Sequence, residues 1–321
     1  MKRVISLVLG ILMGMIGIFV SVGRTPPGDK TISDMKVKVV MPMLSMEFEA
    51  ELADSLMKYL EKYGFEEVDC VSYELDTMKA IEILENCIAE EVDMICMYPV
   101  NDSTAVIQHE AMDQGIGMIT VGMDNKSYDY LVLMDSGKTG RIIAEMSYSW
   151  IVRNLPRGSQ IATIGTNINS DMTALTNSMN ERLKELVGEE YEIVEMAILD
   201  GTGQDALPYV ESLLERYPKL KVVAAYNDSY AISAAEVFHI MGKEDDNIGV
   251  FGCGATSRVL DQISEGKFVR GTVSPGDGAR KWADAAYVWA NKELREEKVR
   301  YTFNIPVTID NVHSYREKDE G

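Results

Sequence analysis

The feature that most constrains the fold is a regular alternation of short apolar runs and amphipathic helical stretches. In the first half, apolar runs cover residues 36–43, 67–73, 93–97 and 117–122, and helical stretches cover 47–63, 77–91 and 102–114. The runs are apolar on both faces, which is typical of buried parallel strands. Helical stretches repeat apolar residues every three or four positions, and Gly64 and Gly115 suit left-handed helix ends. The pattern predicts an α/β, doubly wound sheet.

A second set of the same kind begins near residue 138. We expect its helices over 140–155, 171–187, 205–217, 229–241 and 278–292, and its strands over 160–165, 192–199, 221–226, 247–252, 268–274 and 301–308. Two doubly wound parallel-sheet lobes joined by a hinge are therefore predicted. Ligands of such sheets bind beyond the carboxyl ends of the strands, which places a site in a cleft between the lobes.

We assign residues 36–124 with 276–297 to the N-terminal lobe and residues 125–275 with 298–314 to the C-terminal lobe, and we expect a tail over 315–321.

The N-terminus has the pattern of an export segment. Lys2 and Arg3 precede an uncharged stretch over residues 4–23, and Arg24 follows it. This length suits either a membrane anchor or a cleaved signal peptide, and both remain open. The positive residues favour a cytoplasmic start, so we expect the rest of the chain outside the cytoplasmic membrane, either anchored to it or released. Residues 25–35, with two adjacent prolines, are expected to form a linker.

Charge and motifs exclude several classes of function. The chain has 31 Lys and Arg against 51 Asp and Glu, a net charge of −20, which disfavours a nucleic-acid partner because phosphate binding requires cations. Metalloprotease, nucleophile-elbow and P-loop motifs are absent from the sequence, and its 3 histidines have no catalytic spacing. We therefore expect neither an enzyme nor a cofactor or metal site. The 4 cysteines lie in apolar segments and are expected to be buried thiols.

One glycine-rich stretch approximates a dinucleotide-binding turn. Gly252, Cys253 and Gly254 follow a predicted strand, but Ser257 replaces the third glycine and no acidic residue ends a following strand to hold a ribose. We interpret the stretch as a tight strand-to-helix turn that lines the cleft.

Several segments, in their order, resemble the ribose/galactose-type periplasmic sugar-binding proteins. The segments are MPMLSMEFEAELADSLMKYLEKYG, EEVDMICMYPVNDSTAV, GIGMITVGMDN, VVAAYNDSYAISAAEVFHIMG and IGVFGCGAT. The resemblance covers residues 36–314 and implies the type I periplasmic binding protein fold. The related repressors have a helix-turn-helix before the first strand, whereas this chain has the export segment there.

The resemblance also implies a set of ligand-binding residues, in which aromatic rings stack on a sugar and polar side chains bind its hydroxyl groups. Matched position by position, these are Phe48 as the stacking ring, Met46 where the family often has Asn, Asp102 or its neighbour Asn101, Asp124 and Asn125 near the hinge, and Asn227 with Asp228. Asn followed by Asp also starts a helix well, so Asn227 has a structural alternative. The arginine that usually grips the sugar has no counterpart near residues 171–175.

The resemblance implies an extracytoplasmic solute-binding protein that captures a small sugar-like ligand for an ABC importer. A second interpretation is that the closed form is read by a membrane histidine kinase. The expected partners are thus the ligand, a permease or a sensor kinase, and the membrane through the N-terminal segment.

Overall fold

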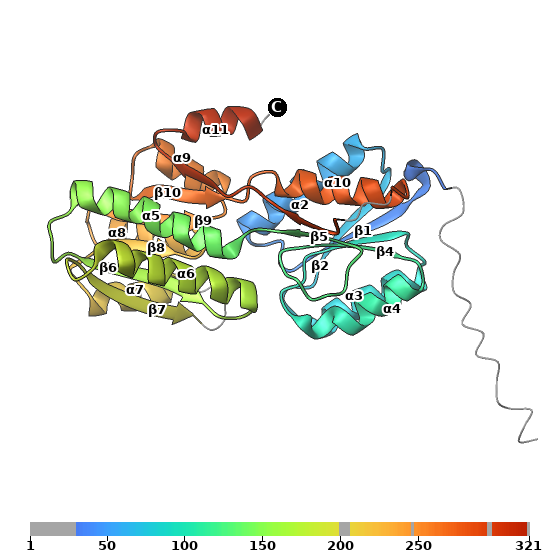
Figure 1. The fold of residues 1–321 in the computed structure, drawn as a ribbon, viewed down its shortest axis with the longest axis horizontal. Helices are drawn as coiled ribbons and strands as arrows, with labels where there is room; N and C mark the ends of the chain where they lie inside the picture. Colours follow the sequence, from blue (N-terminus) through green and yellow to red (C-terminus); the bar gives the residue numbers. More distant parts are fainter. Residues whose placement is uncertain (1–29, 199–205, 245–246, 294–296, 320–321) are drawn as a thin grey trace, which may run out of the picture.

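The chain folds into two lobes that lie side by side, each built on its own six-stranded sheet (Figure 1). In this computed structural model the described residues are 30–198, 206–244, 247–293 and 297–319. The two doubly wound lobes expected from the sequence are confirmed.

The sheet of the first lobe is entirely parallel, in the order β11-β5-β4-β3-β1-β2. Its strands are β1 (Lys36–Met41), β2 (Glu67–Ser72), β3 (Met94–Met97), β4 (Gly117–Val121), β5 (Tyr130–Leu133) and β11 (Val299–Tyr301). The helices α2 (Glu47–Lys62) and α10 (Gly278–Ala290) pack on one face, and α3 (Thr77–Ala89) and α4 (Ala105–Asp113) pack on the other. All residues of β3, β4 and β5 are buried because helices cover both faces.

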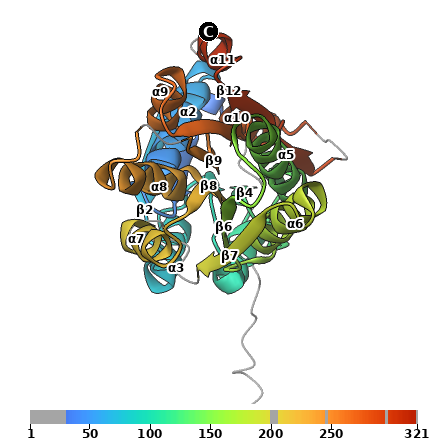
Figure 2. The same ribbon diagram turned by 90° about the vertical axis from the view of Figure 1, so that its left-hand side faces the viewer.

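The second sheet has the order β12-β10-β9-β8-β6-β7, in which only β12 is antiparallel to its neighbour. Its strands are β6 (Gln160–Thr166), β7 (Glu192–Ile198), β8 (Leu220–Ala225), β9 (Gly249–Cys253), β10 (Val269–Ser274) and β12 (Ile305–Thr308). Figure 2 shows helices α5 (Ser136–Asn154) and α6 (Ser170–Val187) on one side of this sheet, with α7 (Ala206–Arg216), α8 (Asp228–Ile240) and α9 (Ser257–Ser264) on the other.

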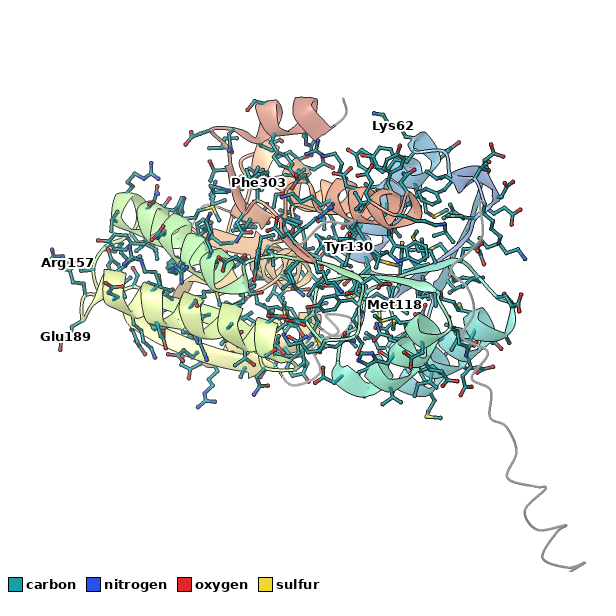
Figure 3. The ribbon with its side chains drawn as sticks, turned by 45° about the vertical axis from the view of Figure 1, so that its right-hand side comes forward. Lys62, Met118, Tyr130, Arg157, Glu189 and Phe303 are labelled. Atoms are coloured by element: carbon teal, nitrogen blue, oxygen red, sulfur yellow. The ribbon has the colours of Figure 1, made fainter. Side chains whose placement is uncertain are left out.

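The chain crosses between the sheets three times, and two of these crossings differ from the expected division. β5 and β11 pair with each other within the first sheet, although residues 125–133 and 299–301 were expected in the second lobe. The reason is that Tyr130 to Leu133 form a short, fully buried strand that extends the first sheet. Figure 3 shows Phe303 at this junction, whereas Arg157 and Glu189 lie at the far end of the second lobe.

Side-chain hydrogen bonds join the crossings. Asn304 Nδ2 donates to the carbonyl oxygen of Asp135 at 2.8 Å and to Thr139 Oγ1 at 2.9 Å, so the β11–β12 crossing is tied to the start of α5. The Lys281 ammonium lies 4.2 Å from the centre of the Phe303 ring, which connects α10 to the same crossing.

Both ends of the described chain are packed, in contrast to the linker and tail expected there. Residues 30–35 include a buried Met35, and Lys30 Nζ donates to Asp93 at 2.8 Å. Residues Val312–Asp319 form helix α11, in which Tyr315 hydrogen-bonds Ser274 at 2.7 Å. The expected signal peptide or anchor over 1–24, with linker residues 25–29, lies outside the described residues. Among the described helices, none is both long and apolar enough for a bilayer.

The close crossing of α5 and α6 depends on Gly140. A Cβ atom at this position would lie 2.2 Å from the carbonyl oxygen of Leu175. Gly140→Ala should therefore force the helices apart and lower the free energy of unfolding by about 2–3 kcal/mol. Gly137→Ala is the matched control in the same helix, since the nearest atom to its Cβ would be Ser178 Oγ at 3.4 Å, an ordinary van der Waals distance. Thermal unfolding checks the pair, and equal melting temperatures would contradict the proposed clash.

Candidate functional site

The candidate site lies where the carboxyl ends of both sheets meet between the lobes. In the first sheet the strand order reverses between β1 and β3, and in the second it reverses between β6 and β8. Such switch points are where open α/β sheets bind ligands. Phe48 follows β1, Tyr98 follows β3, Asp171 follows β6 and Asp228 follows β8. Tyr98 comes directly after its strand, whereas the other three lie in the first turns of helices.

The start of α2 contributes Met46 and Phe48, both expected from the sequence. Met46 is the residue that precedes the helix, and it lines a cavity of about 310 Å³ together with Asp228 and Thr256 of the second lobe. Phe48 also reaches the seam, the surface where the two lobes meet. A Cβ atom on Gly254 of the second lobe would lie 3.5 Å from Phe48 Cδ2. The structure therefore brings these two residues together between the lobes.

Asp228 is buried and holds the turn at Gly254. Its Oδ1 accepts a hydrogen bond from Thr272 Oγ1 at 2.7 Å, and its Oδ2 accepts one from the backbone N–H of Thr256 at 3.0 Å. Burial raises its pKa from 3.8 to about 6 although these donors act in the opposite direction. A Cβ on Gly254 would lie 2.9 Å from Asp228 Oδ2, so the tight turn predicted here is confirmed. Asp228 thus shapes the cleft wall.

Glu49, one residue beyond Phe48, was not expected in the site. Its Oε2 atom is enclosed and has no hydrogen-bond partner among the described residues. Burial raises the pKa of this carboxyl group from 4.5 to about 7. The Glu49 charge also raises the pKa of Tyr73 and Tyr98, so all three side chains face a common region. Tyr73 donates to the carbonyl oxygen of Tyr98 at 2.9 Å, which positions the segment after β3.

Asp171 supplies a second carboxylate from the opposite lobe. Its Oδ2 is enclosed and also lacks a partner among the described residues. Burial, followed by the neighbouring charge of Asp124, raises the pKa of Asp171. The charges of Glu49 and Asp171 both act on the Tyr98 hydroxyl, as does Cys253. Tyr98 therefore lies within reach of the charges of carboxylates from both lobes.

Asp124 lies at the edge of this region. Its carboxylate accepts a hydrogen bond from the backbone N–H of Lys126 at 3.1 Å and forms an ion pair with the Lys126 ammonium. Burial would raise its pKa, but hydrogen bonds from Lys126 and Tyr128 lower it below the ordinary value. A backbone hydrogen bond also connects Asp124 with Asp171. Asp124 is thus close to the cleft, with its charge already partnered.

Three of the expected asparagines have local partners. Asn101 and Asn227 each precede a helix, and their Oδ1 atoms accept from the backbone N–H groups of Ser103 at 2.9 Å and Tyr230 at 3.1 Å. This is the helix-capping alternative. Asn125 is buried and donates to Gln108 at 2.6 Å. Asp102 is exposed. Their role toward a ligand stays a prediction.

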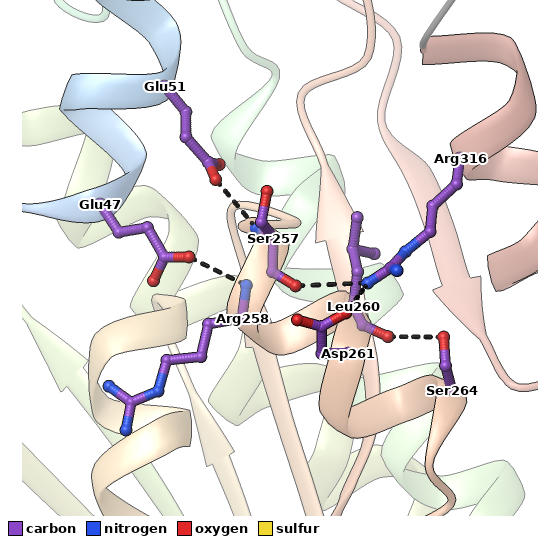
Figure 4. Close-up of polar contacts among 8 residues, drawn as sticks. All are labelled: Glu47, Glu51, Ser257, Arg258, Leu260, Asp261, Ser264 and Arg316. Carbon is purple, nitrogen blue, oxygen red and sulfur yellow. Dashed lines mark hydrogen bonds and ion pairs between the residues drawn. The ribbon is translucent and has the colours of Figure 1, made fainter.

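Hydrogen bonds join the two lobes across the seam on two sides of the candidate site. Glu47 Oε1 accepts from the backbone N–H of Arg258 at 2.9 Å, and Glu51 Oε1 accepts from the N–H of Ser257 at 3.1 Å (Figure 4). On another side, Asn169 Nδ2 donates to the carbonyl oxygen of Val100 at 3.3 Å. The lobes are therefore in contact around the candidate site.

The described residues contain no cluster of His, Cys, Asp and Glu suited to a metal ion. All four cysteines are free, and three of them are buried. Burial raises the pKa of Cys87 to about 11 and also raises that of Cys96 and Cys253. These thiols are therefore protonated at neutral pH, which suits packing rather than nucleophilic chemistry.

Comparison with known proteins gives a consistent result. The family model described as periplasmic binding protein domain matches residues 37–298. The chain is 22% identical to the ribose import binding protein RbsB of Bacillus subtilis, over 89% of this chain and 90% of that protein. It is 23% identical to a putative rhizopine-binding protein of Rhizobium meliloti, over 76% of this chain and 80% of that protein.

Solved structures of low sequence identity share the fold. A Caulobacter myo-inositol binding protein, bound to myo-inositol, matches with a TM-score of 0.76 at 21% identity, covering 93% of this chain and 100% of that one. A periplasmic solute-binding protein of an Actinobacillus succinogenes ABC transporter, with bound D-allose, matches with a TM-score of 0.77 at 18% identity, covering 88% of this chain and 100% of that one.

Proposed function

Because the chain belongs to the periplasmic binding protein family, whose members bind solutes rather than catalyse reactions, we propose that it captures a small sugar-like solute between its lobes and delivers it to an ABC importer. The ligand class is suggested by relatives named for ribose import, and by structural neighbours with bound D-allose and myo-inositol. Identities of 18–22% leave the identity of the solute to this chain's own site.

The observation that carries the proposal is the placement of an aromatic ring and two enclosed carboxylate oxygens at the two switch points. Phe48 offers an apolar face of the kind that packs against the C–H face of a sugar ring. Glu49 and Asp171 each present an oxygen without a partner among the described residues, and such oxygens accept hydrogen bonds from hydroxyl groups. Ligand, ring and acceptors would then be enclosed when the lobes close.

Delivery to an importer is favoured over the sensor interpretation by the relatives. The Bacillus subtilis relative is named for import, and the Actinobacillus succinogenes neighbour belongs to an ABC transporter. No feature of the described residues favours a histidine kinase as the partner. Genes for a permease and an ATPase beside this one would support the importer proposal.

Phe48→Leu tests the site directly. Leucine keeps the apolar volume but removes the flat ring, so we expect the affinity for a bound sugar or polyol to fall about tenfold or more. Binding of D-ribose, D-allose and myo-inositol to the purified chain would be followed by calorimetry, and Phe48→Trp, which keeps an aromatic face, is the comparison. The melting temperature without ligand checks that both variants fold. Unchanged affinity in Phe48→Leu would remove Phe48 from the site.

A further inference from the structure

The cavity of about 310 Å³ stays open between the lobes although they touch at its wall. Ser45, Met46 and Glu47 of the first lobe line it, together with residues of α8 and of the start of α9 in the second lobe. At the wall, Glu47 Oε1 accepts a hydrogen bond from the backbone N–H of Arg258 at 2.9 Å. Packed protein leaves few voids larger than one water molecule, whose share of the liquid is about 30 Å³. A space of this size between touching lobes is in the range of ligand pockets.

Helix α8 presents one face to this cavity. Ser229 and Ser233 supply hydroxyl groups, which both donate and accept hydrogen bonds, and Ile232, only 5% exposed, supplies an apolar surface beside them. The spacing of three and four residues places all the α8 residues of the cavity on one side of the helix, and these are Asp228, Ser229, Ile232, Ser233 and Glu236. A wall that combines hydroxyl groups with apolar surface suits a sugar unit, which has hydroxyl groups and C–H faces.

The cavity borders the part of the cleft that contains Phe48. A Cβ atom on Gly254 would lie 3.5 Å from Phe48 Cδ2 and 2.9 Å from Asp228 Oδ2, so the ring and this carboxylate approach one point. Asp228 lines the cavity, as does Thr256, two residues beyond Gly254, whereas Phe48 does not. The cavity is therefore a space beside the ring, and a solute stacked on Phe48 would have room to extend into it.

The charges along the cavity favour a neutral occupant. Glu236 forms an ion pair with the Arg258 guanidinium, Glu47 accepts from the backbone N–H of Arg258, and both oxygens of Asp228 accept hydrogen bonds within the protein. Each carboxylate thus has a partner and needs no cation from a ligand. Three carboxylates against one guanidinium would nevertheless repel a phosphate or carboxylate group.

We propose that this chain binds a solute larger than one sugar ring, a neutral disaccharide or glycoside, with one unit against Phe48 and the second in the cavity beside α8. The inference rests on the proposed function and specifies its substrate class. The second unit would form hydrogen bonds with Ser229 and Ser233 and pack against Ile232. Because the cavity is walled by both lobes, this unit also stabilises the closed form.

The test is calorimetric binding of matched ligands to the purified chain. The series is D-galactose with melibiose, D-glucose with maltose and cellobiose, and myo-inositol with galactinol, so that several linkages are sampled. We expect at least one of the two-unit ligands to bind about tenfold or more tightly than either of its component units.

Ser233→Leu should reduce this ligand to the affinity of its single unit, because the larger apolar side chain fills the cavity. Ser233→Ala removes only the hydroxyl group and should weaken the two-unit ligand about fivefold. Ser212→Leu makes the same change as the first variant at an exposed position of α7, and it should retain the preference. The melting temperature without ligand checks that each variant folds.

The outcomes distinguish the inference from the function beneath it. Single units that bind as tightly as every two-unit ligand would overturn the inference and leave the proposed function standing. A preference for two units that both Ser233 variants retain would also overturn it, since the second unit would then lie elsewhere. Failure of every sugar and polyol in the series would overturn both.

Discussion

Glu49→Gln should make the protein without ligand more stable at pH 8, by roughly 3 kcal/mol, while it weakens ligand binding. The carboxyl group is enclosed, its Oε2 atom lacks a partner among the described residues, and burial raises its pKa from 4.5 to about 7 although a backbone hydrogen bond acts in the opposite direction. Each tenfold difference in proton affinity between folded and unfolded chain corresponds to about 1.4 kcal/mol of stability. Glutamine keeps the shape of the side chain and removes the charge, so the penalty disappears.

The sign of the pH dependence follows from proton binding. Between pH 4.5 and about 7 the folded chain holds a proton on Glu49 that the unfolded chain has released. The stability of the wild type therefore falls as the pH rises through this window, and the loss is complete above it. Asp228, whose pKa is raised to about 6, contributes in the same direction at lower pH. The advantage of Glu49→Gln should thus be large at pH 8 and small at pH 5.

Thermal or urea unfolding at pH 5, 6, 7 and 8 measures this difference. Glu85→Gln is the matched control, because it removes the same charge from an exposed site and should leave the stability profile unchanged. A gain in stability together with a loss of ligand affinity is the pattern of a residue kept for function. A variant less stable than wild type at pH 8 would show instead that Glu49 has a stabilising partner.

The architecture was predictable from the sequence because buried parallel strands and amphipathic helices leave periodic patterns. The alternation from residue 36 onward predicts both lobes, and the glycines at 252 and 254 predict the tight turn. The strand Tyr130–Leu133 was missed because four apolar residues carry little periodicity. That omission moved the expected lobe boundary from the crossing after β5 to residue 124.

The candidate site was predictable only in part, because neighbouring side chains in the first turn of a helix point in different directions, and the sequence does not show which of them faces the cleft. Phe48 was found from the resemblance, whereas its neighbour Glu49 was not. Tyr98 directly follows β3 at a switch point, and this position alone could have identified it. Asp171 lies in the segment where the resemblance leads one to expect an arginine, so it was not considered as a site residue. Asn101 and Asn227 fit the family pattern, yet their Oδ1 atoms cap helices.

Removing Glu47 and Glu51 together should shift the protein toward an open form and weaken ligand binding by about 10-fold, with about 30-fold as the upper limit. These carboxylates from α2 accept the backbone N–H groups of Arg258 and Ser257, at the start of α9 in the other lobe. The residue before α9, Thr256, makes no side-chain cap of its own. The two glutamates therefore cap α9 across the seam, and they lie at the positive end of its dipole.

The expected size follows from the capping geometry. Each helix cap of this kind contributes about 1 kcal/mol, and the two together contribute about 2 kcal/mol to the closed form. The apparent affinity of a ligand that binds only the closed form is proportional to the closed fraction, so about 2 kcal/mol lowers it by at most about 30-fold, and by about 15-fold if open and closed forms are equal in the wild type. Arg316 of α11 donates to Asp261 at 2.6 Å, so α9 stays fixed to its own lobe when the caps are lost.

The double variant Glu47→Ala/Glu51→Ala would be compared with Glu61→Ala, an exposed position near the other end of α2. Small-angle scattering with and without ligand reports the open fraction, and calorimetry reports the affinity. A larger radius of gyration without ligand, together with weaker binding, is expected for the double variant alone. The corresponding Gln variants retain an acceptor oxygen and should fall between, since they lose only the charge. If the double variant matches Glu61→Ala in both measurements, the contacts to α9 do not hold the lobes together.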